Sequence, residues 1–207
     1  FLGVRHDLVY LAGHFSGSSA LAADYNTRML TSDVATSSLD MRNMIIYSTG
    51  CHSSYNTVDT DSVPDVTVDL DWPQVMARKG ALLIGGTGYQ YGDVDLMEYG
   101  ERLYLNLTKE LRAGGTVPVG KALVRAKQDY LSASGVEIDG VVKKTLLIST
   151  LFGLPMLSVQ GLTPGAGVSG NIRFDDVLVT DPRTDVMALR RRIGMIFQRP
   201  NPFPLSI

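Results

Sequence analysis

The amino-acid sequence predicts an α/β fold in which a mostly parallel sheet is covered by helices on both faces. Two observations support this prediction. Short apolar runs bounded by turn residues recur along the chain, and the segments between them repeat apolar residues with the period of a helix. Strands that alternate with helices are typical of sheets buried on both sides. We expect residues 1–161 to form this domain.

The strand candidates are short, nearly continuous apolar runs that end in turns rich in glycine and serine. A run of this length without polar alternation is typical of a strand that is buried on both faces. The candidates are residues 8–12 (LVYLA), 44–47 (MIIY), 81–84 (ALLI) and, as the last strand, 156–159 (MLSV).

The helix candidates lie between these runs. Leucines in residues 95–112 fall on one stripe, and Gly114-Gly115 then ends the predicted helix. Residues 118–131 form a second stripe, with Pro118 in the first helical turn, a position that proline favours. Residues 71–79 form a shorter candidate, and the ambiguous residues 143–152 are interpreted as a helix.

Two chemically distinctive residues follow the first two predicted strands. His14 comes directly after residues 8–12 and Gly13, and Cys51 comes after residues 44–47 and a short turn. In open α/β sheets, ligands bind beyond the carboxyl ends of the strands. If the two strands are parallel neighbours, the imidazole and the thiol lie on the same edge of the sheet.

Cys51 is the only cysteine, so the chain has no internal disulfide. A lone thiol is most often a small buried hydrophobe, but with a histidine partner it is a candidate nucleophile. A cysteine hydrolase needs a base that lowers the pKa of the thiol and N–H groups that stabilise the oxyanion. The sequence predicts His14 as the base of Cys51; His52, beside the thiol, is the alternative.

An apolar block that ends in His14, followed by a second block that ends in Gly50-Cys51, resembles the caspase-like clan of cysteine peptidases. The interval of 51 − 14 = 37 residues is similar to that of gingipain-like members. Residues 81–92 (ALLIGGTGYQYG) and 151–159 (LFGLPMLSV) resemble the next strand with its cleft loop and the terminal element of these domains. The resemblance implies a caspase-like three-layer αβα fold, truncated at its N-terminus, with the activity of a cysteine endopeptidase.

The resemblance also implies the parts of a site. Catalysis would be carried out by His14 and Cys51, without a cofactor or a metal, on a peptide or protein substrate, in a secreted or cell-envelope protein. Phe15 stands where the clan usually has glycine, and Leu154 where it usually has aspartate; the first change alters the shape of the pocket. The backbone N–H groups expected at the oxyanion are those of Phe15 and Cys51. The residues expected to line the substrate pocket, or else to form only a polar loop, are Gly50, His52, Tyr89, Gln90 and Tyr91.

Residues 115–121 (GTVPVGK) match the G-x-x-x-x-G-K pattern of phosphate-binding loops. Ala122 replaces the hydroxyl residue that would bind Mg²⁺, and the segment follows a predicted helix where a real loop follows a buried strand. We interpret the segment as a helix end, followed by Pro118 opening the next helix.

The composition changes after about residue 161. Residues 162–207, especially 189–207 (LRRRIGMIFQRPNPFPLSI), resemble part of the ATPase subunit of a phosphate-import ABC transporter. The resemblance places Gln198 at the start of the loop that senses the nucleotide. Because the other nucleotide motifs are absent, we expect an incompletely folded fragment with at most one helix, near residues 185–192, which cannot work alone.

The overall composition narrows the possible partners. A net charge of −2 gives no nucleic-acid footprint, and no apolar run approaches the about 18 residues of a membrane span. The sequence does not set the oligomeric state. Three hypotheses remain: a thiol hydrolase, an ATP-binding transporter fragment, and an inactive scaffold with a peptidase fold.

Overall fold

A four-stranded sheet forms the centre of the computed structural model, which describes residues 2–22, 24–57, 70–93, 96–133, 140–160, 173–174 and 177–178. Its strand order is β1-β5-β6-β8, in which β1, β5 and β6 are parallel and β8 is antiparallel to β6. This confirms the predicted α/β fold with a mostly parallel sheet. The strands are β1 (Leu8–Leu11), β5 (Ile45–Ser48), β6 (Leu82–Gly86) and β8 (Ser149–Phe152).

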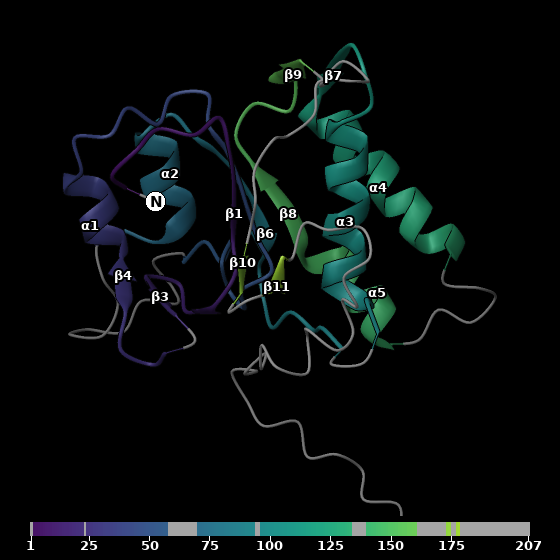
Figure 1. Ribbon diagram of the computed structural model, residues 1–207, viewed down its shortest axis with the longest axis horizontal. Helices are drawn as coiled ribbons and strands as arrows, with labels where there is room; N and C mark the ends of the chain where they lie inside the picture. The colour runs from purple at the N-terminus through teal and green to yellow at the C-terminus, as the bar shows by residue number, and fades with distance from the viewer. Residues whose placement is uncertain are drawn as a thin grey trace, which may run out of the picture.

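Helices cover both faces of this sheet. Figure 1 shows α1 (Thr31–Thr36) and α2 (Trp72–Arg78) on one side, and α3 (Tyr99–Leu111), α4 (Val119–Ala133) and α5 (Gly140–Ile148) on the other. Leu103, Leu107 and Leu111 of the predicted stripe are buried in α3, whereas Leu96 precedes the helix and is exposed. The three layers agree with the alternation of strands and helices in the sequence.

Successive residues of the central strands serve two separate cores, because side chains alternate between the faces of a strand. Ile45 and Tyr47 of β5 belong to the core beneath α3 and α4, whereas Met44 and Ile46 belong to the core beneath α1 and α2. All four are buried, so the strand needs apolar residues at every position. This explains why the run shows no polar alternation.

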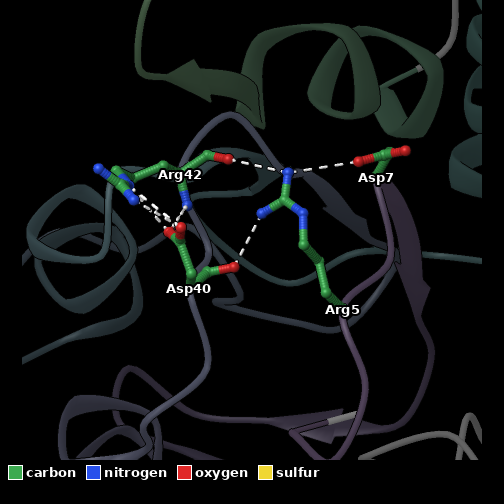
Figure 2. A network of polar contacts seen from close by, with 4 residues as sticks. All are labelled: Arg5, Asp7, Asp40 and Arg42. Carbon is green, nitrogen blue, oxygen red and sulfur yellow. Dashed lines mark hydrogen bonds and ion pairs between the residues drawn. The ribbon is translucent and has the colours of Figure 1, made fainter.

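An exposed polar network holds the start of β1 against the turn that precedes β5 (Figure 2). The Arg5 guanidinium donates to the backbone oxygens of Asp40 at 2.8 Å and Arg42 at 3.1 Å, and to the Asp7 carboxylate at 3.3 Å. The N–H of Ile45 donates to the backbone oxygen of Asp7 at 2.9 Å. These bonds join the residues just before β1 to those just before β5.

Three smaller antiparallel sheets complete the described structure. One contains β2 (His14–Phe15), β3 (Ser19–Leu21) and β4 (Arg28–Leu30) in that order. A second pairs β7 (Thr116–Pro118) with β9 (Ser158–Gln160), and a third pairs β10 (Arg173–Phe174) with β11 (Val177–Leu178). None of these strands exceeds three residues.

The structure corrects three sequence-based expectations. Residues 143–152 do not form one helix, because α5 ends at Ile148 and the chain continues as β8. The ammonium of Lys127, on α4, fixes this end by donating to the backbone oxygens of Leu146 and Ser149, both at 2.7 Å. Residues 156–159 contribute to β9, outside the central sheet, and Pro118 is the last residue of β7 instead of the first of a helix.

Among the residues that the structure describes, no helix has the length and apolar character needed to cross a membrane. The predicted boundary at residue 161 and the helix expected near residues 185–192 lie outside the described residues, as does Gln198.

Candidate functional site

The register of β1 and β5 brings the predicted catalytic pair to one edge of the sheet. The pairing ends at Leu11 and Ser48, which are register partners in parallel strands. His14 and Cys51 each lie three residues beyond these partners (14 − 11 = 3 and 51 − 48 = 3). Because parallel strands end at the same edge, both residues leave the sheet on the side where α/β proteins bind ligands.

Close packing joins the two segments beyond the strands. The ring of Phe15, only 3% exposed, lies so close to Gly50 that a Cβ atom at residue 50 would be 2.1 Å from the ring carbon Cδ2. The same ring lies 5.4 Å from the ring of Trp72 on α2, measured between centroids. Any larger residue at position 50 would therefore displace the Phe15 ring. The contact fixes the neighbours of these residues, His14 and Cys51, relative to each other.

Gln90 holds the turn that carries Cys51. Its buried side-chain amide donates to the backbone oxygens of Ser48 at 2.9 Å and Gly50 at 3.0 Å. The Cys51 thiol in turn donates to the backbone oxygen of Gln90 at 3.6 Å. The sequence predicts Gln90 as a pocket residue; the structure places its buried side chain against the turn.

The backbone N–H groups around Cys51 are almost all used within the fold. That of Gly50 donates to the Ser48 hydroxyl at 2.9 Å, and that of His52 to the backbone oxygen of Gly88 at 2.9 Å. That of Ser53 donates to the backbone oxygen of Gly50 at 3.3 Å. In the described part of the chain, the N–H of Cys51 has no acceptor except its own sulfur. The oxyanion role that the sequence predicts for this N–H stays a prediction.

Burial keeps the Cys51 thiol protonated. Desolvation raises the pKa of the half-buried thiol, and the hydrogen bond to Gln90 and the positive charge of Lys144 lower it by less. No hydrogen bond joins Cys51 to His14 among the described residues; the imidazole instead stacks on the ring of Tyr25, with centroids 5.4 Å apart. The pair shares an edge of the sheet, but the thiol points to a carbonyl oxygen in this state.

The His52 ring packs against two tyrosine rings. Its backbone is left-handed, with φ of 57°, and its ring contacts the rings of Tyr89 at 4.6 Å and Tyr55 at 5.7 Å between centroids. Burial, followed by the charge of Lys144, lowers the pKa of His52, so this imidazole is neutral at pH 7. These contacts pack the His52 ring against Tyr55 and against Tyr89, which belongs to the loop after β6.

Lys144 is the residue of this region that the sequence does not reveal. From α5, its ammonium donates to the Tyr91 hydroxyl at 3.1 Å and lies 4.9 Å from the centroid of the Tyr91 ring and 5.7 Å from that of Tyr89. Tyr89 and Tyr91 are both partly exposed, as pocket residues would be. A lysine 53 positions from its partner, on an amphipathic helix, carries no sequence signal that links it to Cys51.

The segment that matches the phosphate-loop pattern is used for packing. The N–H groups of Val119 and Gly120 donate to the backbone oxygens of Leu157 and Pro155, both at 2.9 Å. A Cβ atom at Gly120 would lie 2.6 Å from the Cβ of Pro155. Because these N–H groups are occupied, the segment does not form a phosphate cradle. This agrees with the sequence, in which Ala122 replaces the hydroxyl residue that would bind Mg²⁺. Among the described residues there is also no group of three His, Cys, Asp or Glu side chains that could hold a metal ion.

Comparison with known proteins reveals similarity over a short segment. A stretch of 38 residues, 18% of this chain, is 68% identical to the phosphate import ATP-binding protein PstB 1 of Yersinia pestis bv. Antiqua. The protein of the same name from Yersinia pseudotuberculosis serotype I matches to the same extent. The matched segment spans 14% of the length of these relatives. No family model and no solved structure matches the chain.

The resemblance to the ATPase of phosphate importers is therefore confirmed at the level of a short segment. The resemblance to gingipain-like peptidases, and the caspase-like character of the fold, stay predictions.

Gly50→Ala tests the contact that joins the two halves of the site. The added methyl group overlaps the Phe15 ring, and overpacking of this kind costs about 1–3 kcal/mol of unfolding free energy. Gly114→Ala is the matched control, because a Cβ atom there meets nothing within 4 Å. Urea denaturation measures both variants. Equal unfolding free energies for the two would contradict the assigned packing.

The pH dependence of thiol alkylation tests the electrostatics of Cys51. Because burial raises the pKa of the thiol, its reaction with iodoacetamide should reach half-maximal rate at a higher pH than that of a cysteine in an unfolded peptide. Lys144→Met removes a charge that lowers this pKa, so the midpoint should move to still higher pH. An unchanged midpoint in Lys144→Met, with Lys121→Met as the control for loss of a distant lysine, would show that Lys144 does not act on the thiol.

Proposed function

We propose that this protein is a thiol hydrolase that cleaves peptide bonds, with Cys51 as the nucleophile and His14 as the general base. The observation that carries the proposal is the common edge of the sheet to which β1 and β5 deliver the two residues. The contact of Phe15 with Gly50 supports it, because this contact fixes the segments that carry the imidazole and the thiol.

The reaction proceeds in two steps. The Cys51 sulfur attacks the carbonyl carbon, its proton passes to the imidazole of His14, and the imidazole gives this proton to the leaving amine as the peptide bond breaks. Water then attacks the thioester, releases the new carboxylic acid and restores the thiol. The N–H of Cys51, which has no acceptor beyond its own sulfur in the described part of the chain, donates to the oxyanion. The backbone N–H of Phe15 is the second donor that the sequence predicts.

For this reaction the thiol must leave the Gln90 carbonyl oxygen and turn towards His14. The 3.6 Å contact with sulfur is weak and costs little to break. Hydrogen bonds of catalytic groups are often long in the absence of substrate and shorten when substrate binds. The raised pKa of the thiol means that proton transfer to His14 accompanies the attack, so that a resting thiolate is not required.

Variants of the two residues test the proposed function. Cys51→Ala should abolish hydrolysis of a mixed peptide library and labelling by a peptidyl chloromethyl ketone. His14→Gln should lower kcat by about 100-fold or more, the usual contribution of a general base. His52→Gln should retain activity within a few-fold, because its ring is engaged by Tyr55 and Tyr89. Hydrolysis that persists in Cys51→Ala would refute the proposal, and labelling without hydrolysis would identify an inactive scaffold.

A second candidate function is nucleotide binding, because 38 residues are 68% identical to the phosphate import ATP-binding protein PstB 1. We expect Gln198 to contact the nucleotide in that case. Isothermal titration of the full chain with Mg-ATP should then give saturable binding that Gln198→Ala weakens at least about tenfold, the loss of roughly 1.4 kcal/mol. No binding, or binding that Gln198→Ala leaves unchanged, would contradict this second function.

A further inference from the structure

The buried side chain of Gln90 lies between two glycines. A Cβ atom at Gly86, the last residue of β6, would be 2.5 Å from Gln90 Cγ. A Cβ atom at Gly100, in the first turn of α3, would be 3.3 Å from Gln90 Oε1. The space that the amide occupies between the sheet and α3 therefore depends on the absence of side chains at both positions.

Two carbonyl oxygens fix the direction in which the Gln90 amide points. Its Nε2 donates to the backbone oxygens of Ser48 at 2.9 Å and Gly50 at 3.0 Å. A reversed amide would set Oε1 against these two acceptors, and neither hydrogen bond could form. Oε1 therefore points to α3, where a buried oxygen needs a donor of its own. In the part of the chain that the structure describes, Oε1 has no partner at normal hydrogen-bond distance.

The hydroxyl of Tyr104 is the candidate donor. Tyr104 follows Gly100 by one turn of α3, and helical side chains lean towards the N-terminus, so its ring reaches back to the place where Oε1 lies. Burial raises the pKa of Tyr104, and the side chains of Ser149 and Gln90 lower it by less, so both lie near the hydroxyl. Among the described residues this hydroxyl, too, lacks a partner at normal hydrogen-bond distance.

Ser149 cannot take the place of Tyr104 as the donor. Its hydroxyl proton is used, because it donates to the backbone oxygen of Thr145 at 2.9 Å. The Tyr104 ring is also held in place, since it stacks on the ring of Tyr47 with centroids 6.0 Å apart. Of these neighbouring side chains, Tyr104 is therefore the one that has both a proton to give and a fixed position.

We propose that Tyr104 is a positioning residue for Cys51, whose hydroxyl donates to Gln90 Oε1 and so holds Nε2 against the two carbonyl oxygens of the turn. A small movement of either side chain closes this hydrogen bond. The inference rests on the proposed function, in which Cys51 is the nucleophile. Without the donor the amide can reverse, which sets Oε1 against the oxygens of Ser48 and Gly50 and loosens the turn. Tyr104 acts through Gln90 and takes no part in bond breaking.

Alkylation of Cys51 by iodoacetamide in the full chain tests this role without requiring hydrolysis. Tyr104→Phe removes only the hydroxyl, so the loosened turn should expose the thiol and raise the rate at fixed pH about 2- to 10-fold, the range expected for the loss of one hydrogen bond. The midpoint of the pH profile should move to lower pH, because burial raises the pKa of the thiol. Tyr130→Phe, which removes another buried hydroxyl from the same core, is the control and should change neither quantity.

A double-mutant comparison separates an action through Gln90 from a loss of packing. Gln90→Met keeps the length of the side chain but lacks the amide, so adding Tyr104→Phe to it should change the rate by less than about twofold. The same rise in both backgrounds, or no rise in Tyr104→Phe alone, overturns the inference. Should Gln90→Met fail to fold, hydrogen exchange of the Gln90 side-chain amide decides. This exchange must be faster in Tyr104→Phe than in the parent chain, and equal rates overturn the inference.

Peptide cleavage distinguishes the failure of this inference from the failure of the proposed function. If the full chain cleaves peptides, Tyr104→Phe should lower kcat about 2- to 10-fold with KM unchanged. An unchanged kcat overturns the inference and leaves the hydrolase in place. If nothing is cleaved, the hydrolase fails, and the alkylation rates still decide whether Tyr104 positions the thiol through Gln90.

Discussion

The site depends on one contact, in which the ring of Phe15 occupies the space that a side chain at residue 50 would need. Register alone brings His14 and Cys51 to the same edge, but three residues beyond the last pair a chain is free to diverge. The buried ring removes this freedom because it is held from behind by Trp72, whose indole N–H donates to the backbone oxygen of Ser16 at 3.0 Å. Packing between apolar groups thus positions the polar ones.

Near this contact, strong hydrogen bonds hold the backbone of the turn that carries Cys51, whereas the thiol itself is held weakly. Gln90 satisfies two carbonyl oxygens of the turn, while the sulfur makes only a long contact. A rigid turn with a loosely held nucleophile suits a group that has to rotate during a reaction. Two cations, Arg28 and Lys144, belong to β4 and α5, which lie on opposite sides of the central sheet (Figure 1). The two positive charges therefore come from elements that are far apart in the sequence.

The sequence predicts the parts of this fold that depend on long apolar patterns and misses those that depend on tertiary contacts. The central strands β1, β5 and β6 and the helices α3 and α4 follow from their apolar spacing. The sheet β2-β3-β4 does not, because strands of two or three residues have no periodicity to detect. Residues 149–152 (STLF) are too short a run to separate from α5 by periodicity, and pairing with β6 makes them a strand. Of the candidate site, the sequence predicts Cys51 and His14, whereas the contacts of Gln90 and Lys144 arise across the fold.

The two candidate functions make different demands on the chain. Peptide hydrolysis needs a nucleophile, a base and an oxyanion donor, and His14 and Cys51, which would supply them, lie on one described edge. Nucleotide binding needs N–H groups that point at phosphates, and the described segment whose sequence pattern offers them has donated those of Val119 and Gly120 to Leu157 and Pro155. Position 120 requires glycine because Pro155 packs against its Cα. The glycine is therefore explained by packing, without a phosphate ligand. Any nucleotide contact therefore has to come from residues other than Val119 and Gly120, so the test of peptide hydrolysis at Cys51 does not depend on nucleotide binding.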